Sequence, residues 1–181
     1  LVSGFDIETG NLLWTSSASS VTTSDLNGFY HSLVDDRYYV SLASGYIKAL
    51  ATNGSTLMAS AKIGGGRVPK QVTVTGKFVV VYSESLNGAD RKLELLNRGS
   101  GGYYITLPQA DEVTALAYIE KERFVAFTTS GNATKVTLYD NDAETEITST
   151  VSGVTGITKA ETISATAILC LTDQGLCVIN P

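Results

Sequence analysis

The sequence is poor in the residues that build metal sites and catalytic centres. Its 181 residues include one histidine, two cysteines, one tryptophan and three prolines. A zinc site needs three or four Cys, His or acidic ligands at close spacing, and no such set stands near the two cysteines. His31 has no neighbour in the sequence that would make it a general base, so we expect a structural or surface role for it. We predict no catalytic residue, no metal-binding residue and no enzymatic activity.

Runs of one charge and long apolar runs are scarce as well. No Lys or Arg cluster is longer than a pair, and the net charge is -5, which excludes a phosphate-tracking surface and hence nucleic-acid binding. The longest apolar stretches, at 78–82 and 165–171, fall far short of the roughly twenty residues that span a bilayer. No secretory signal pattern opens the chain, which begins LVSGFDIETG and is expected to be a processed piece of a longer protein.

Short β-branched or alternating runs, separated by turn residues, fill the sequence instead. Apolar residues make up 43% of the chain and glycines number 17, enough to bury a core and to supply many turns. The pattern predicts an all-β protein with few helices. The expected strands are 29–34, 38–42, 46–50, 56–62, 71–75, 77–83, 93–96, 103–107, 113–119, 124–129, 135–139, 146–151, 163–171 and 176–179.

The decapeptide FDIETGNLLW, residues 5–14, provides the template of an internal repeat. An apolar residue precedes Asp6, a turn closes at Thr9 and Gly10, and Trp14 follows the glycine by four positions. Asp, Asn or Thr before Gly supplies the positive-φ geometry of a tight hairpin turn. We expect Trp14 to point from the outer strand into the wedge between two adjacent sheets, which is a packing role.

Three weaker copies of this template follow. The position of Asp6 recurs at Ala51, Asn97 and Asp140, at spacings of 45, 46 and 43 residues. Gly54 and Gly101 close the turns of the second and third copies, and no glycine closes the fourth. Met58, Ile105 and Thr148 stand where tryptophan would be.

A period of about 40 to 47 residues with four strands in each copy predicts a β-propeller of four-stranded antiparallel blades. We predict one domain, residues 1–181, with blade units at 1–16, 17–63, 64–107, 108–151 and 152–181. About four blades would either close as a small ring or belong to a seven- or eight-bladed propeller. In the small ring, residues 11–15 would supply the outer strand that the last blade lacks; open edges would instead invite self-association.

The string from Asp6 to Trp14 resembles the repeat of the pyrroloquinoline-quinone-type β-propellers, A-L-D-x-x-T-G-x-x-x-W. Ala49 and Leu50 match its first two positions, but only the first copy matches well. Quinoprotein dehydrogenases of this family hold a quinone and a calcium ion in a central funnel. This sequence has no carboxylates clustered at ligand spacing, so we expect no cofactor.

Two non-catalytic groups share such degenerate repeats. One is the lipoprotein propeller scaffold of the bacterial outer-membrane assembly machine. The other, which the chain resembles most, is the luminal propeller of the largest subunit of the endoplasmic reticulum membrane protein complex. This resemblance implies a scaffold in the endoplasmic reticulum lumen that binds other subunits or client proteins of a machine for inserting transmembrane proteins. The bacterial alternative implies the periplasm.

Several further motifs have structural interpretations beside functional ones. Asn53 and Asn132 begin N-glycosylation triplets in predicted hairpin turns. Cys170 and Cys177 would lie opposite each other across a hairpin, either as a cross-strand disulfide or as two small buried thiols. The glycine-rich runs 63–68 and 98–102 follow no βα unit and no Lys-Ser or Lys-Thr closes them, so we interpret them as an inter-blade connection and a hairpin turn rather than as phosphate loops.

Overall fold

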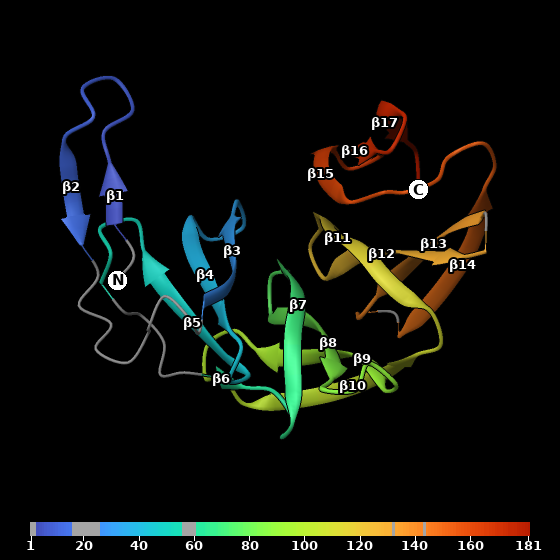
Figure 1. The fold of residues 1–181 in the computed structure, drawn as a ribbon, viewed down its shortest axis with the longest axis horizontal. Coiled ribbons are helices and arrows are strands. Elements are labelled where there is room, and N and C mark those ends of the chain that lie inside the picture. Colours follow the sequence, from blue (N-terminus) through green and yellow to red (C-terminus); the bar gives the residue numbers. More distant parts are fainter. Residues whose placement is uncertain (1–2, 16–25, 56–60, 132, 143) are drawn as a thin grey trace.

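The computed structural model describes residues 3–15, 26–55, 61–131, 133–142 and 144–181 (Figure 1). These residues form seventeen strands and no helix, so none of them lies in a helix that could cross a bilayer. The predicted all-β class is confirmed. The predicted strand at 56–62 lies mostly outside the described residues, as does Met58, and only its last two residues are seen as a strand.

The strands form five antiparallel sheets in which strands consecutive in the chain are neighbours in the sheet. The first is the hairpin of β1 (Ser3–Phe5) and β2 (Leu12–Thr15). The second has β3 (Leu26–Ser32), β4 (Arg37–Leu42), β5 (Tyr46–Ala51) and β6 (Ala61–Lys62). The third has β7 (Arg67–Val74), β8 (Phe78–Ser85), β9 (Arg91–Asn97) and β10 (Tyr103–Gln109).

The last two sheets continue the same order. The fourth has β11 (Glu112–Glu120), β12 (Arg123–Ser130), β13 (Ala133–Asp140) and β14 (Thr145–Val151). The fifth has only three strands, β15 (Lys159–Ser164), β16 (Ala167–Thr172) and β17 (Gly175–Ile179). The single strand predicted over 163–171 is wrong, because the chain turns between Ser164 and Ala167 and pairs these two residues across a hairpin.

The sheets follow one another as blades around an arc (Figure 1). The first strands of the second to fifth sheets contact one another in order, β3 with β7, β7 with β11 and β11 with β15. These four strands therefore line the inner side of the arc, and the later strands of each sheet lie progressively farther out. The four-stranded antiparallel blades expected from the repeat are confirmed in the second, third and fourth sheets.

The arc is open, and its first and last sheets lie at opposite ends (Figure 1). β2 pairs with β1, and β17 pairs with β16. Of the two expected arrangements, the small closed ring with residues 11–15 beside the last strand is not the one that this structure shows. Trp14 of the hairpin lies instead against the second sheet, 6.1 Å from the ring of Tyr38 and in contact with Gly54.

Three layers of buried side chains lie between the second, third, fourth and fifth sheets, and a smaller cluster of Val40, Leu42 and Leu50 lies on the other face of the second sheet. β8 shows why the middle strands are continuously apolar: successive side chains point to opposite faces of a sheet. Val79 and Val81 are fully buried against the second sheet. Val80 and Tyr82, one position on, are buried against the fourth sheet. A blade covered on both faces has no polar side, which explains the unbroken run at 78–82.

The repeated turn joins the third strand of a sheet to its fourth. Asp6 Oδ1 accepts hydrogen bonds from the backbone N–H groups of Glu8 and Thr9 at 3.0 and 2.7 Å. Asn97 accepts equivalent bonds from the two N–H groups at positions 99 and 100, and Asp140 accepts one from position 142 at 3.1 Å. The third and fourth copies thus keep a side-chain hydrogen bond of the turn, whereas Ala51 of the second copy has no side-chain acceptor.

The positive φ of the repeated turn is also kept in every copy. Gly10, Gly54 and Gly101 have φ values of +71°, +80° and +70°. In the fourth copy, Glu144 takes the same place with φ +52°. A non-glycine residue in this region costs of the order of 1 kcal/mol, which the pairing of β13 with β14 on either side of the turn must offset.

Candidate functional site

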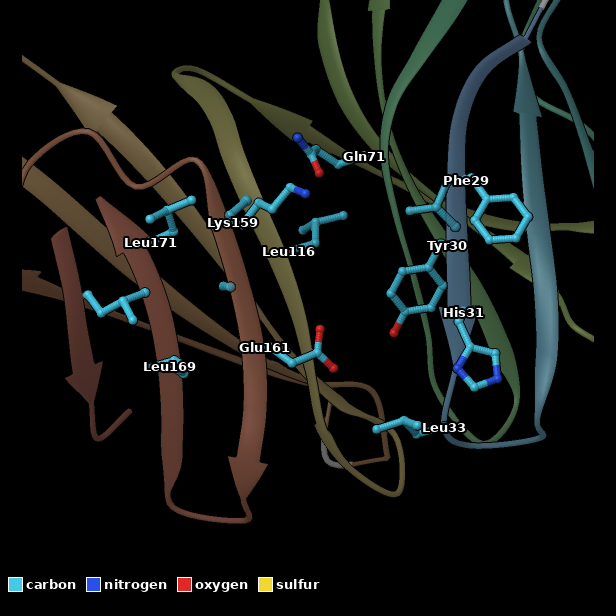
Figure 2. Close-up of a pocket in the computed structure, with 14 residues that line it drawn as sticks. Phe29, Tyr30, His31, Leu33, Gln71, Leu116, Lys159, Glu161, Leu169 and Leu171 are labelled. Carbon is cyan, nitrogen blue, oxygen red and sulfur yellow. The ribbon is translucent and has the colours of Figure 1, made fainter. Parts of the chain in front are cut away.

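The concave side of the arc contains a groove with a volume of about 500 Å³. Its floor is made by β7 and β11, one wall by β3, and the other wall by the fifth sheet (Figure 2). The two walls are more than 120 residues apart in the sequence. They face each other only because the sheets between them turn the chain around the arc (Figure 1).

The side chains of β3 alternate between the two faces of the second sheet: Phe29 and His31 lie at the rim of the groove and point away from β15, toward Tyr38, whereas Tyr30 points toward β15 (Figure 2). Phe29 is 53% exposed and stacks on Tyr38 with ring centroids 5.1 Å apart. His31 lies on the same side, 4.9 Å from the ring of Tyr38, and its Nε2 lies 2.9 Å from Asp36 Oδ1. Leu33, at the end of the strand, is 71% exposed. The predicted surface role of His31 agrees with this placement.

Tyr30 faces the other way and joins β3 to the floor. Its hydroxyl lies 3.3 Å from Thr73 Oγ1 of β7. Burial raises the pKa of Tyr30, the hydrogen bond with Thr73 lowers it in part, and the negative charge of Glu161 raises it further. Figure 2 shows the Tyr30 hydroxyl and the Glu161 carboxylate directed toward the space between β3 and β15. Tyr30 therefore remains a neutral phenol near neutral pH.

The opposite wall is one face of the fifth sheet. Lys159 is paired with Leu171, and Glu161 with Leu169, across β15 and β16. Leu171 is in turn paired with Leu176 of β17. Directly opposed residues share a face of the sheet, so two charges and three leucines present a mixed surface. Leu171 and Leu176 are 42% and 71% exposed.

The groove is lined mostly by apolar and aromatic side chains, together with Lys159 and Glu161. No group of three or more His, Cys, Asp or Glu side chains able to hold a metal ion occurs among the described residues. Trp14, which a quinone funnel would need for stacking, lies instead at the far end of the arc against the second sheet, 6.1 Å from the ring of Tyr38. The side chains of this structure therefore do not fit a quinone and calcium site.

The glycine-rich run 63–68 connects the second sheet to the third. The N–H of Gly64 donates to Glu94 Oε1 at 2.8 Å. The guanidinium of Arg67, which is 7% exposed, donates to Ser83 Oγ at 2.8 Å and to Asp90 Oδ2 at 2.6 Å. This run is thus held by a buried polar network of the third sheet. The N–H of Gly64 and the guanidinium of Arg67 are already engaged within the protein.

The run 98–102 is the hairpin turn between β9 and β10, and Arg98 reaches back to the second sheet. Its Nη1 lies 3.5 Å from Asp35 Oδ2, and Tyr39 donates its hydroxyl to the same oxygen at 2.9 Å. Burial and the charge of Asp35 raise the pKa of Tyr39. This cluster joins two sheets and belongs to the packing of the arc.

The two glycosylation candidates lie in different settings. Asn53 is exposed, and its Oδ1 accepts hydrogen bonds from the backbone N–H and the hydroxyl of Ser55, at 3.0 and 2.8 Å. The intervening Gly54 is buried. Asn132 lies outside the described residues, in the sequence between the end of β12 at Ser130 and the start of β13 at Ala133.

The two cysteines are directly opposite each other on β16 and β17, and both are free thiols. Cys170 is fully buried and Cys177 is partly exposed. Burial raises the pKa of Cys170 to about 11, and the neighbouring Cys177 adds to the shift. Thiols at this pKa are poor nucleophiles, so Cys170 is a packing residue of the layer between the fourth and fifth sheets.

Sequence reasoning did not find the groove. The exposed residues of β3 and β15 lie on strands whose boundaries were predicted incompletely or wrongly. In addition, proximity between two strands so far apart in the sequence produces no local sequence pattern. The one relevant signal in the sequence is the repetition of a group of strands in successive blade units. This repetition predicts that the first strands of the units lie together on one side of the blades.

Comparisons with solved structures agree with this architecture. No family model matches the chain, and no curated protein matches it. The Dos1 propeller superposes with a TM-score of 0.69 at 18% identity, over 98% of this chain and 49% of that one. The chain has the β-propeller fold. The WD40 repeats of RRP9 give a TM-score of 0.66 at 13% identity, over 90% of this chain and 51% of that one.

A third propeller, the WD40 domain of Neurospora crassa Pan2, gives a TM-score of 0.62 at 11% identity, over 87% of this chain and 47% of that one. The chain thus spans about half the length of the propellers it matches. Identities this low establish the shared fold alone. They do not establish the quinone-type repeat family or the membrane complex that the first repeat resembles.

Proposed function

We propose that this propeller is a non-catalytic scaffold that binds other proteins through the groove on its concave side. The observation that carries the proposal is the exposed apolar side chains on both sides of the groove, Leu33 directly after β3 with Phe29 at the rim, and Leu171 and Leu176 on the fifth sheet. Exposed apolar patches bordered by polar groups mark interaction sites, and here Lys159 and Glu161 border the patch. WD40-type propellers such as those of RRP9 and Pan2 typically act as protein scaffolds, which supports the proposal.

Site-specific photo-crosslinking tests this surface directly. A benzophenone amino acid is placed at Phe29 in the groove, and in a control protein at Leu86, which is 81% exposed on the turn between β8 and β9. A protein partner crosslinked from position 29 and not from position 86 is then purified, and its affinity is measured by calorimetry. We expect Leu33→Glu to weaken this partner at least about tenfold, equal to about 1.4 kcal/mol. An unchanged affinity would remove the groove as the binding surface.

We further propose a more specific setting, the luminal propeller of the endoplasmic reticulum membrane protein complex. The support is general: the string from Asp6 to Trp14 resembles the repeat of the quinone-type propellers once, and the other copies are degenerate, as in that protein. The blades would dock other subunits or client proteins in the lumen, and the propeller would not itself insert transmembrane segments. A bacterial outer-membrane assembly scaffold in the periplasm is the alternative.

Glycan occupancy separates the luminal setting from the bacterial one. In a eukaryotic secretory host, the luminal protein would be a glycoprotein at Asn53 or Asn132, and peptide mass spectrometry after endoglycosidase treatment reads each site. A chain left bare at both positions argues for the bacterial scaffold. Dye-linked alcohol oxidation after addition of the quinone and calcium checks the remaining alternative, and any turnover would overturn the scaffold proposal.

The two ends of the arc offer a second route to protein association. The edge of β17 that faces away from β16 has no partner strand among the described residues. Unpaired strand edges readily take up further strands. We therefore propose that the protein also self-associates through these open ends.

A further inference from the structure

The outer strands of the four-stranded blades differ in how their free edges are protected. The second, third and fourth sheets end on their outer side in β6, β10 and β14, and no described strand pairs with the other edge of these three. Such an edge presents unpaired N–H and C=O groups, which proteins usually blunt with proline, lysine or a bulge. β10 has a bulge between Tyr103 and Ile105 and contains Pro108, whereas only two residues of β6 are described.

β14 has none of these protections. It pairs with β13 from Thr145 to Val151 in a regular register without a bulge, and every residue but the last is exposed. The sequence from Ile147 to Val151 contains no charge and no proline, and its β-branched residues favour a strand. β14 lies on the outer side of the arc, away from the groove (Figure 1). Its free edge is therefore a template for a further strand.

The two faces of β14 set which side chains an added strand would bring. On one face, Ile147 is 60% exposed and is paired with Leu138, which packs on the layer between the fourth and fifth sheets. An apolar side chain beside Ile147 would extend this layer outward. On the other face, the hydroxyls of Thr148 and Thr137 lie 3.0 Å apart, and a further threonine or serine would continue this row of hydroxyls.

The charges around β14 are unequal at its two ends. At the N-terminal end, Lys77 binds Asp142 at 2.6 Å, while Glu144 and Glu146 are exposed and form no salt bridge with a described residue. At the other end, Lys135, the neighbour of Thr150 on β13, is already neutralised by Asp111 at 3.2 Å. Opposite charges on directly opposed residues stabilise a strand pair. The uncompensated carboxylates therefore call for a basic residue at one end of the added strand.

We propose that the free edge of β14 binds an extended, basic segment of another protein, which adds antiparallel as a fifth strand of the fourth sheet. Main-chain hydrogen bonds supply the affinity of such strand addition, and alternate side chains supply the specificity. The segment alternates β-branched apolar residues, one of them opposite Ile147, with threonines or serines, one of them opposite Thr148. Its C-terminal end carries lysine or arginine opposite Glu146 and Glu144. This inference goes beyond the scaffold proposal, because it assigns a second surface and the chemistry of its partner.

Titration of the ¹⁵N-labelled protein with a synthetic peptide tests the edge. The probe acetyl-VTVTVKTK-amide places valine opposite Ile147 and lysines opposite Glu146 and Glu144 when it lies antiparallel to β14. We expect a dissociation constant of about 0.1 to 1 mM, with the largest amide shifts in residues 145–151. The edge of β10, residues 103–109, is the internal control. No binding at a peptide concentration of about 2 mM, or larger shifts in β10 than in β14, would overturn the proposal.

Reversal of one charge tests the direction and the chemistry of the segment. Glu146→Lys should weaken the lysine probe at least about threefold and strengthen acetyl-VTVTVETE-amide. Glu112→Lys changes the net charge equally at an exposed residue at the start of β11, the opposite edge of the same sheet, and should leave both affinities unchanged. Equal effects of the two variants would show general attraction to an acidic protein and would overturn the proposed edge. Circular dichroism shows that both variants are folded.

N-methylation of the probe tests strand pairing itself. The N–H groups of alternate residues point to opposite edges of a strand, so N-methylation at the valines and N-methylation at the threonines block different edges. One of these two peptides should bind at least about tenfold more weakly than the probe and the other should bind as it does. Any other pattern would exclude strand addition, and a protein that dimerises through β14 without peptide would assign the edge to a second copy instead. Leu33→Glu should leave probe binding unchanged, which separates this test from that of the groove.

Discussion

The indole ring of Trp14 lies against Gly54, the turn glycine of the next copy of the repeat. A Cβ atom added to Gly54 would overlap the ring. The two residues are therefore complementary in size. The tryptophan fills the wedge between the hairpin and the second sheet, and the glycine, which has no side chain, leaves room for it. This contact links one repeat to the next and explains why a sequence motif with a period of about 45 residues produces stacked sheets.

Replacing Trp14 with alanine should loosen the end of the arc without affecting any other site. Loss of a fully buried aromatic ring costs about 3 to 5 kcal/mol, and since Trp14 is only half-buried we expect about 2 kcal/mol. Urea unfolding measures the difference. Ile7→Ala, at a side chain that is 99% exposed, is the control and should change stability by less than about 0.5 kcal/mol. A Trp14→Ala protein that unfolds like the parent would contradict the packing role.

A comparison of two glycines separates backbone strain from crowding by the indole. Gly10→Ala adds a Cβ at φ +71° with no atom within 4 Å, whereas Gly54→Ala adds one at φ +80° against Trp14. We expect about 1 kcal/mol of destabilisation at Gly10 and at least about 2 kcal/mol at Gly54. In the Trp14→Ala background the cost at Gly54 should fall to that at Gly10, which a double-mutant cycle measures. Equal costs in both backgrounds would show that the ring does not limit the turn.

Glu122 joins the fourth sheet to the third, and its loss should destabilise the centre of the arc. The residue is 5% exposed, and its Oε2 accepts hydrogen bonds from Thr75 Oγ1 at 2.7 Å and from the N–H of Lys77 at 2.9 Å. Glu122→Ala leaves both donors unsatisfied, so we expect about 2 to 4 kcal/mol. Glu120→Ala removes a part-exposed partner of Arg123 and should cost less than about 1 kcal/mol. Similar unfolding free energies for the two variants would refute the inter-sheet role of Glu122.

The thiol of Cys170 should make the fold sensitive to alkaline pH. Its pKa in the folded protein is raised to about 11 from an ordinary value of 9.0, chiefly by burial. A raised pKa means that its contribution to stability is complete below about pH 9 and is lost as the pH rises through about 11. We expect the free energy of unfolding to fall more steeply between these values in the parent than in Cys170→Ala. The variant retains the tyrosines, including Tyr139, whose pKa burial raises to about 12, so the difference in slope isolates the thiol. Parallel curves would contradict the shift.

Local chemistry explains which parts of this structure were predictable. The turn at Asp6 recurs at Asn97 and Asp140, and in all three the side chain accepts a hydrogen bond from the N–H two residues on. Asp and Asn can cap the N–H groups of their own turn whatever the rest of the fold does. The run at 78–82 is apolar on both faces, and the structure buries both. These signals depend on neighbours within a few residues, and they were enough to predict strands, turns and four-stranded sheets.

Other features depended on contacts that have no local signature. The boundary between β15 and β16 was missed because residues 163–171 include no strong turn residue, and the sequence left open whether the blades close as a small ring. Nothing near Phe29 indicates that it shares a groove with Lys159 and Leu176. That neighbourhood results from the angles between four successive sheets, each set by the packing of many side chains.

By itself, the sequence determined that the chain folds into a series of antiparallel sheets, since turn residues and apolar alternation act over distances of a few positions. Only the tertiary structure decided that these sheets form an open arc with a groove inside it and an apolar face at each end. The reason is physical: the overall curvature is the sum of the rotations between successive sheets, and the sequence of one repeat does not determine that sum.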